Sequence, residues 1–330
     1  MSLNILYIGR ETNYLNYKNI FENNLCNYDF GFFLLSLKTF AKVNLLTFKN
    51  VLDKNFTYDY DYAIIDAKLI MDYPPKTLMD VFKIKIKSNV SIYVSYDRPF
   101  KQEDIIGFEH CLNVDYYFIT NLLKDIGKYG LSHKFEKKIR STFHGMGFIN
   151  SPYNLKNNTF ETIKRNKDYK FNIFYNGTSY GKRTNRFQFS NFVKNLKNID
   201  NINIECYSRK ESHKYRLSPS EYSNATRQAK INLVLSGWEN NMTYRFYEVL
   251  YLKAFFLVDS GILNYQISDS FDEKELFVFE NAEQLYTFIN FYLKYDDERE
   301  KLLLKLVKNF ENIYSPQKHG KQLINLLTNN

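Results

Sequence analysis

The sequence has few cysteines, no long hydrophobic run and no leader-like start, and each absence excludes a class of protein. Its three cysteines, Cys26, Cys111 and Cys206, are widely spaced and odd in number, which excludes a disulfide framework. Every apolar run is far shorter than the ~20 residues of a membrane-spanning helix. The start "MSLNILYIGR" lacks a basic region followed by an apolar one. We therefore expect a cytoplasmic protein without a transmembrane segment.

What the chain does contain is enough apolar material for two cores. Its 330 residues are 44% hydrophobic and 18% aromatic, and a chain of this length usually forms two domains of roughly 150 residues each. The formal net charge of +9 favours an anionic partner. Phosphate-bearing substrates, nucleic acid and an acidic membrane surface all meet that description.

The N-terminal half repeats one pattern, a short apolar strand that ends in a small or polar residue and is followed by a helical stretch. Strands "NILYIG", "DYAIID" and "VSIYVSYD" end at Gly9, Asp66 and Asp97, and another strand is predicted around His144. Continuous apolar strands that alternate with helices are typical of parallel α/β sheets. Ligands of such doubly wound sheets bind beyond the carboxyl ends of the strands.

The pattern lapses over residues 151–170, which are polar and rich in Asn and Lys, and then restarts. We expect a first domain over residues 1–150, a linker over 151–170 and a second Rossmann-like domain over 171–330. From Ala282 onwards apolar residues recur at helical spacing, with a break predicted at Asp297–Arg299.

The stretch "FYNGTSYGKRTNRF" opens the second domain with a strand that ends at Gly177. Thr178, Arg183 and Arg186 follow before the next helix, so that backbone donors and cations gather at one strand edge. The glycines form neither a G-x-G-x-x-G motif nor a P-loop. An exposed basic turn without a ligand is the alternative interpretation.

The stretch "MTYRFYEVLYLKAFFLVDS" places Thr243, Tyr244, Arg245 and Glu248 at the start of an apolar helix that follows a strand. Such a helix start suits a phosphate. Thr243 could cap the helix or donate to a phosphate oxygen, and Arg245 could pair with a diphosphate. Glu248, one turn further, could accept two ribose hydroxyls. The alternative is an N-cap threonine beside a surface Arg/Glu pair.

These residues, followed by "LFVFENAEQLYTFINFYLKYDDEREKLL", resemble the donor-binding domain of GT-B glycosyltransferases, especially the group related to the spore-maturation protein CgeB. The resemblance covers mainly residues 171–320. It implies two Rossmann-like domains that face a cleft, the first for the acceptor and the second for a nucleotide-sugar donor. It also implies that Glu248 binds the donor ribose and that the preceding turn contacts the diphosphate.

The sequence departs from that pattern at two positions. The glycine usually found five residues after the glutamate is Lys253 here. The earlier glutamate of the E-x7-E pattern of retaining enzymes falls on Asn240, with Glu239 beside it. The stereochemical outcome therefore stays open.

On the acceptor side, Asp97 is the best candidate for a general base, because a carboxylate at a strand end could deprotonate an acceptor hydroxyl. Asp66 competes for this role, Gly9 would permit close approach of a substrate, and His144 could act on the donor sugar or the phosphate. Each has a structural alternative. Asp97 could merely cap a helix, and a lone histidine near glycines is more often structural.

Together these features predict a metal-independent glycosyltransferase that moves a sugar from a nucleotide-diphosphate sugar, expected to be a UDP-sugar, to an acceptor hydroxyl. No cofactor or metal is expected, because the Cys and His residues lack ligand spacing, and Arg183, Arg186 and Arg245 would stabilise the leaving diphosphate. A hydroxymethylated DNA base, as in phage DNA glycosyltransferases, is slightly favoured as acceptor over an envelope glycan. The basic segments also suit contact with an anionic surface.

Two other functions stay open. A non-catalytic GT-B-like protein that binds nucleotide or nucleic acid would keep Glu248 and the basic segments without depending on Asp97. A nucleotide-sugar epimerase of GT-B fold would act on the free donor, but the His and Glu pattern of that group is weak here.

Overall fold

The protein consists of two compact units. Unit 1 comprises Met1–Gly145, Ser151–Phe160 and Ser315–Asn330, and unit 2 comprises Met146–Asn150 and Glu161–Tyr314. The computed structural model describes residues 3–26, 28, 30–95, 108–109, 112–120, 122, 124, 133–143, 145–146, 149, 151–157, 159–161, 163–164, 167–177, 185–196, 204–208, 217–237, 243–264 and 276–329, with β10 and parts of α6 and α7 described by their backbone.

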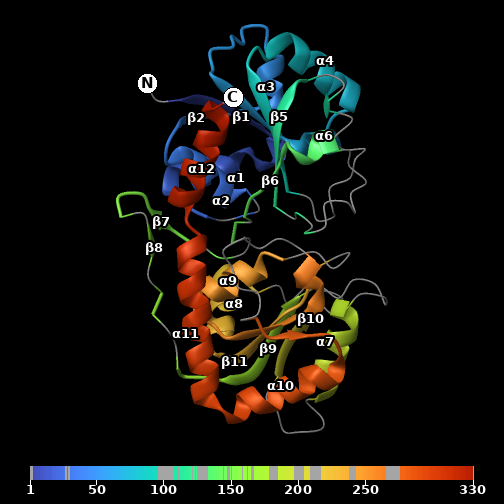
Figure 1. The fold of residues 1–330 in the computed structure, drawn as a ribbon, viewed down its shortest axis with the longest axis vertical. Coiled ribbons are helices and arrows are strands. Elements are labelled where there is room, and N and C mark those ends of the chain that lie inside the picture. Colours follow the sequence, from blue (N-terminus) through green and yellow to red (C-terminus); the bar gives the residue numbers. More distant parts are fainter. Residues whose placement is uncertain are drawn as a thin grey trace. The chain divides into compact units, whose positions relative to one another are not determined.

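A parallel sheet forms the centre of unit 1 (Figure 1). Its described strands are β1 (Asn4–Gly9), β2 (Lys42–Thr47), β3 (Tyr62–Asp66), β4 (Asn89–Val94), β5 (Val114–Ile119) and β6 (Ile139–Ser141). They lie in the order β2-β1-β3-β4-β5-β6. The order reverses between β1 and β3, which is the switch point where open α/β sheets usually bind ligands.

Helices cover both faces of this sheet. The described helices of unit 1 are η1 (Glu11–Asn13), α1 (Tyr14–Asn23), α2 (Gly31–Lys38), α3 (Phe48–Leu52), η2 (Ala67–Met71), α4 (Pro75–Lys85), α6 (His133–Glu136) and α12 (Pro316–Thr328). Phe48 of α3 and Phe82 of α4 belong to the core on one face. On the other face Phe33 of α2 stacks on Tyr93 of β4, with ring centroids 4.5 Å apart. Residues 151–160 add the antiparallel pair β7 (Tyr153–Asn154) and β8 (Thr159–Phe160).

The last helix of the chain, α12, packs against α2 of unit 1 (Figure 1). Its buried His319 lies between the rings of Phe32 and Phe143, at centroid distances of 5.4 and 5.9 Å. The His319 Nε2 atom is 2.9 Å from the Thr142 hydroxyl oxygen. Burial lowers the pKa of His319 to about 4 from an ordinary 6.5. The imidazole is therefore neutral in the folded protein at neutral pH.

Unit 2 is built on a second parallel sheet. Its described strands are β9 (Phe171–Gly177), β10 (Ile204–Ser208), β11 (Ala229–Val234), β12 (Phe256–Asp259) and β13 (Val278–Phe279), in the order β10-β9-β11-β12-β13. The helices described are α7 (Asn185–Leu196), α8 (Pro219–Arg227), α9 (Arg245–Tyr251), η5 (Ser260–Asn264), α10 (Ala282–Lys294) and α11 (Asp296–Ile313). The switch point of this sheet lies between β9 and β11.

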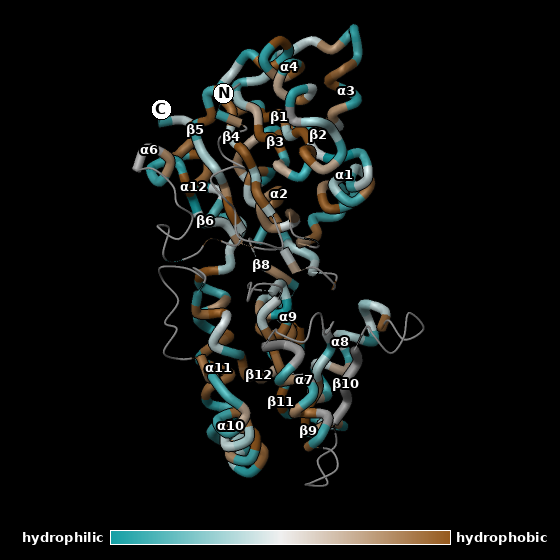
Figure 2. The backbone as a smooth tube through the Cα atoms, turned by 90° about the vertical axis from the view of Figure 1, so that its right-hand side faces the viewer, coloured by the Kyte–Doolittle hydropathy of each residue, from teal (hydrophilic) through white to brown (hydrophobic). Residues whose placement is uncertain are grey.

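The strands of both sheets run largely through hydrophobic residues (Figure 2), as expected of parallel strands covered on both faces. In unit 2 the core on one face joins α7, α10 and α11. On the other face Phe174 of β9 and Phe256 of β12 contact the rings of Tyr222 of α8 and Phe246 of α9. Two layers of helices thus enclose the sheet.

The corner between α10 and α11 is fixed by a buried arginine. Arg299 is 1% exposed and donates from Nη1 to the Tyr292 carbonyl oxygen at 2.6 Å and to Asp296 Oδ1 at 2.7 Å. Its guanidinium lies over the Tyr169 ring, 5.3 Å from the centroid. The break predicted at Asp297–Arg299 instead falls at Tyr295, because α10 ends at Lys294 and α11 begins at Asp296.

Helix α9 ends in a turn that a glycine would fit best. The Lys253 N–H donates to the Leu250 carbonyl oxygen and the Ala254 N–H to that of Val249, which is the Schellman pattern. Lys253 has a φ of 53°, in the left-handed region. The position that departs from the glycosyltransferase pattern in residue type therefore has the backbone conformation that glycine prefers.

The predicted class of two parallel α/β units and the predicted helical C-terminal region are confirmed. Two strand ends differ from the prediction. The strand expected around His144 is β6, which ends at Ser141, and β4 ends at Val94 rather than at Asp97. None of the described helices is both long and apolar enough to cross a membrane.

The burial of His319 predicts an acid-dependent loss of stability. Between pH 6.5 and about 4 the unfolded chain binds a proton at this residue that the folded chain does not. The contribution of His319 to the unfolding free energy is therefore fully present above pH 6.5 and falls by about 3 kcal/mol towards pH 4. The His319→Gln variant, which can still bond Thr142, should lose less stability over this range in urea unfolding. Equal pH slopes for the two proteins would contradict this assignment.

The left-handed conformation of Lys253 predicts that Lys253→Gly is more stable than Lys253→Ala by about 1 kcal/mol. Both variants remove the pairing of Lys253 Nζ with Glu311 Oε1, which are 3.4 Å apart, so that only the cost of a Cβ atom at this φ differs between them. Thermal unfolding of the two variants measures the difference. An alanine variant as stable as the glycine variant would show that the turn carries no strain.

Candidate functional site

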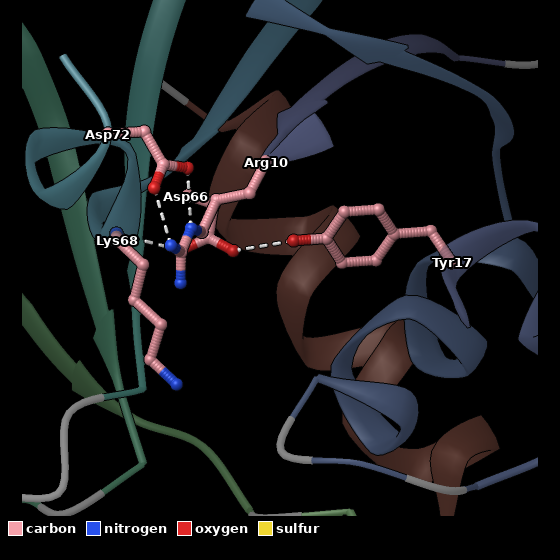
Figure 3. A network of polar contacts seen from close by, with 5 residues as sticks. All are labelled: Arg10, Tyr17, Asp66, Lys68 and Asp72. Carbon is pink, nitrogen blue, oxygen red and sulfur yellow. Dashed lines mark hydrogen bonds and ion pairs between the residues drawn. The ribbon is translucent and has the colours of Figure 1, made fainter. Parts of the chain in front are cut away.

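The switch point of the unit 1 sheet is filled by a polar network (Figure 3). Asp66, the last residue of β3, is 1% exposed. Its Oδ2 atom accepts from the Tyr17 hydroxyl at 2.9 Å, and its Oδ1 atom accepts from the Lys68 backbone N–H at 2.9 Å. The Tyr7 hydroxyl lies 3.5 Å from Oδ2. Asp66 therefore caps η2 and joins it to α1 and β1.

The electrostatics of this network favour a structural role for the Asp66 carboxylate. Burial raises the pKa of Asp66, against the opposing effects of the Lys68 charge and N–H, the Tyr17 hydroxyl and the Arg10 charge. Burial and the same carboxylate also raise the pKa of Tyr17, so its hydroxyl stays protonated and donates. Asp66 thus uses both oxygens inside the protein.

Gly9 and Arg10 complete the same edge. A Cβ atom at Gly9 would overlap the Tyr17 ring, at 2.7 Å from Cζ, so the absence of a side chain leaves room for that ring. Arg10 Nε donates to Asp72 Oδ2 at 2.6 Å, and Nη2 pairs with the other oxygen. Figure 3 shows the Arg10 guanidinium facing the Asp72 carboxylate. The room predicted at Gly9 for a substrate is taken up by Tyr17.

Two other predicted acceptor-side residues, Asp97 and His144, lie outside the described residues. Strand β4 lies between β3 and β5, and the chain that follows it is described as far as Ser95, two residues before Asp97.

The switch point of unit 2 brings a glycine and an arginine together. Gly177 ends β9, and a Cβ atom placed there would overlap the Tyr175 hydroxyl and lie 2.9 Å from Arg245 Nη1. The guanidinium of Arg245, the first residue of α9, therefore reaches the end of β9. Two of the predicted donor-side residues, 68 positions apart by subtraction of their numbers, meet at the expected edge.

Glu248 stands one turn further along α9 and is 0% exposed. Tyr222 of α8, itself 3% exposed, lies close enough for the charge of Glu248 to act on its hydroxyl. Burial, followed by the charge of Glu248, raises the pKa of Tyr222. Burial alone would lower the pKa of Arg245, but the surrounding tyrosine oxygens and Glu248 raise it overall. A buried carboxylate, a guanidinium and a phenol thus form one group.

The start of α9 differs from the prediction for Thr243. The helix begins at Arg245, its N-cap is Tyr244, and no side chain caps it, so Thr243 is not the cap. The Thr243 Oγ1 atom is buried and has no hydrogen-bond partner within the described part of the chain. Thr178 and Arg183 lie outside the described residues, as do Glu239 and Asn240, and Arg186 belongs to α7 without a described side chain.

Sequence reasoning missed a second buried carboxylate at this edge. Asp259, the last residue of β12, accepts from the Ser236 N–H and hydroxyl, each at 2.9 Å, and from the Gly261 N–H at 3.0 Å. It therefore fixes the chain where it leaves β11. The available signal was an aspartate at the end of the apolar run "AFFLVD".

No group of metal-ligating side chains was found among the residues that the structure describes. An Asp-x-Asp pair, Asp59 and Asp61, lies before β3 at the amino edge of the sheet. There the Asn4 N–H donates to Asp61 Oδ2 at 2.7 Å, and the Asn4 amide donates to the Asp59 carbonyl oxygen at 2.8 Å. This pair joins β1 to the start of β3, away from the carboxyl edges.

Comparison with known proteins agrees with the fold described above. The model of a family described as glycosyl transferase-like matches residues 156–325, which contain the Gly177, Tyr222, Arg245 and Glu248 group. No curated protein sequence matches the chain. The finer likeness to the CgeB-related group stays a prediction.

Several solved structures share the fold over the whole chain. The β-glucosyltransferase of phage T4 is 15% identical, with a TM-score of 0.55 and coverage of 99% of this chain and 100% of that one. HepE of Anabaena, solved with UDP and glucose, is 10% identical, with a TM-score of 0.55 and the same coverage. OtsA is 8% identical, with a TM-score of 0.60 and 99% of both chains covered.

Proposed function

The chain belongs to the glycosyl transferase-like family and is a glycosyltransferase of the GT-B fold, and we propose that it moves a sugar from a UDP-sugar to an acceptor hydroxyl. The observation that carries this proposal is the buried Glu248 carboxylate, one helical turn from the Arg245 guanidinium, at the switch point of the unit 2 sheet.

In the proposed site Glu248 binds the donor ribose. A carboxylate accepts hydrogen bonds, and the two hydroxyls of a ribose are adjacent donors. Full burial strengthens such bonds, because little water competes for the same oxygens. The solved HepE complex with UDP and glucose, on the same fold, supports a uridine nucleotide as the first candidate.

Arg245 is proposed to hold the diphosphate near Gly177. A guanidinium offers parallel N–H donors that match phosphate oxygens. A Cβ atom at Gly177 would overlap the Tyr175 hydroxyl and lie 2.9 Å from Arg245 Nη1, so the missing side chain lets the guanidinium reach the end of β9, where the diphosphate is proposed to bind. Further hydrogen-bond donors are proposed to come from the Tyr244 backbone and from Thr178, Arg183, Arg186 and Thr243. The three arginines, at positions 183, 186 and 245, would stabilise the negative charge on the leaving UDP.

Asp97 is proposed as the general base if the transfer inverts the anomeric configuration. The acceptor oxygen would form the new bond to the anomeric carbon while its proton passes to the Asp97 carboxylate. The bond from that carbon to the UDP oxygen would break, with its electron pair leaving on UDP. The buried contacts of Asp66 favour Asp97 over Asp66 for this role, since both Asp66 oxygens already accept hydrogen bonds.

A hydroxymethylated DNA base is the acceptor that we favour, with an envelope glycan close behind. The net charge of +9 suits a polyanion. A β-glucosyltransferase described as a DNA-modifying enzyme shares the fold at 17% identity, with a TM-score of 0.55 and 98% of this chain covered. A cytoplasmic location would fit a DNA acceptor.

The donor assignment predicts that UDP binds the wild-type protein and that Glu248→Gln weakens this binding about tenfold or more, since a hydrogen bond to a charged group is lost. Calorimetric titration with UDP, GDP, ADP, CMP and dTDP measures the affinity and the preferred base. Glu283→Gln, at an exposed position of α10 in the same unit, is the matched control and should bind as the wild type does. If the Glu248→Gln and Glu283→Gln variants bind UDP equally well, Glu248 is not part of the donor site.

The base assignment predicts that Asp97→Asn lowers the transfer rate by at least about a hundredfold, because the proton acceptor is lost. UDP affinity should stay unchanged. Transfer is followed with radiolabelled UDP-glucose on hydroxymethylated DNA, on unmodified DNA and on a glycan mixture, and Asp80→Asn on the exposed face of α4 is the control. If only glycans are labelled, the acceptor is a glycan and not DNA. If the Asp97→Asn variant stays active, Asp97 is not the general base.

A further inference from the structure

We propose that Asp259 is a positioning residue of the donor site, which holds the chain leaving β11 against β12 and so keeps the ends of β9 and β11 apart. The proposal rests on the function proposed above, because the donor diphosphate is expected at the switch point between those two strand ends. It adds to the site a residue of β12, which lies on the far side of β11 from β9.

The first support is the register of the strands, which shows that β9 and β11 part before they end. The ladder described between them ends at the pair of Phe174 and Asn232. Strand β9 continues to Gly177, still paired with β10, whereas β11 continues to Val234, still paired with β12. At the carboxyl edge each strand therefore follows its outer neighbour, and the two separate at the switch point.

The second support is the set of hydrogen bonds to the buried Asp259 carboxylate, at the end of β12. Ser236, just beyond β11, donates from its backbone N–H and from its hydroxyl to Asp259 Oδ2, each at 2.9 Å. The other oxygen, Oδ1, accepts from the Gly261 N–H at 3.0 Å. Bonds to a carboxylate are stronger than those between neutral groups. The hold of β12 on this chain thus extends past the last strand pair.

The third support is the place of the Arg245 guanidinium. Its Nη1 atom would lie 2.9 Å from a Cβ atom at Gly177, so it reaches the end of β9 at the point where β11 has turned away. A phosphate bound by this guanidinium needs room beside it. A chain leaving β11 that shifted toward β9 would take up that room, and a chain already fixed on the other side need not be ordered when the donor arrives.

Replacement of one carboxylate oxygen tests this role. Asp259→Asn keeps the size of the side chain but puts an amide nitrogen, which cannot accept, opposite at least one of the N–H donors. We expect the dissociation constant for UDP to rise about tenfold, because a hydrogen bond to a charged group is lost and the chain beyond β11 is released. The KM for the UDP-sugar should rise by the same factor and kcat should stay within twofold, since Asp259 is not proposed to touch the reacting atoms.

Ser236→Ala is a milder variant that keeps the Ser236 N–H bond and the Gly261 bond. It should raise the dissociation constant for UDP about threefold. In the Asp259→Asn background Ser236→Ala should weaken UDP binding by less than twofold, because the acceptor of the serine hydroxyl is already altered.

Asn232→Ala is the matched control. Asn232 is a buried polar residue of the same strand, and its amide nitrogen donates to the carbonyl oxygens of Thr226 and Phe255, each at 3.1 Å. These bonds lie below the carboxyl edge and do not hold the chain that leaves β11. The variant should therefore unfold at a lower temperature than the wild type but bind UDP within twofold of it. Thermal unfolding of all variants shows whether a change in affinity follows from lost stability.

The outcomes separate this inference from the proposed function. If the wild type binds UDP and Glu248→Gln weakens binding, but Asp259→Asn and Ser236→Ala bind as the wild type, the positioning role is overturned and the donor site stands. A fall in kcat with an unchanged KM in Asp259→Asn, or an equal loss of UDP affinity in Asn232→Ala, also overturns it. If the wild type binds no nucleotide, the proposed function fails and this inference with it.

Discussion

The burial of the Glu248 carboxylate is the constraint on which the rest of the candidate site depends. A charged group removed from water is costly unless neighbouring groups compensate it. Here the charge of Arg245, from the same helix, provides that compensation, and the Tyr222 phenol of the preceding helix lies nearby. The absence of a side chain at Gly177 leaves room for the Arg245 guanidinium and the Tyr175 hydroxyl. The arrangement of the candidate site thus depends on the burial of one carboxylate.

The two sheets use their switch points differently. In unit 1 the carboxylate at that point, Asp66, is engaged by a tyrosine and a backbone N–H, and the tyrosine ring fills the space beside Gly9. In unit 2 the absence of a side chain at Gly177 leaves room for the Tyr175 hydroxyl and the Arg245 guanidinium. The same topology therefore places a carboxylate held by internal hydrogen bonds at one switch point and an arginine at the other.

Much of the fold could be read from the sequence, because strands covered on both faces are continuous apolar runs. Gly9, Asp66 and Gly177 were predicted as strand ends for that reason, and the structure confirms those ends. Strand β2 gave a weaker signal, since it lies at the sheet edge and most of its residues are half-buried. Arg245 and Glu248 could be paired by helical spacing alone.

Other parts of the site depend on contacts between distant segments, about which local patterns say nothing. Tyr222 and Glu248 come from two helices, and their proximity follows from how both helices pack on one sheet. The hydrogen bonds from Ser236 to Asp259 likewise join two segments that are distant in the sequence. At Lys253 the residue type itself was misleading. Lysine rarely adopts a left-handed conformation, but the hydrogen bonds at the end of α9 impose one here.

The return of the chain to unit 1 through α12 sets an order for folding during synthesis. Domains usually fold from the N-terminus onwards as the ribosome extends the chain. Unit 1, however, includes residues 315–330, and α2, buried along nearly its whole length, packs against α12. Unit 2 can therefore be complete while unit 1 still exposes the part of α2 that α12 covers. The first unit to be translated is the last to close, and the nascent protein must keep that surface from aggregation until its final helix is made.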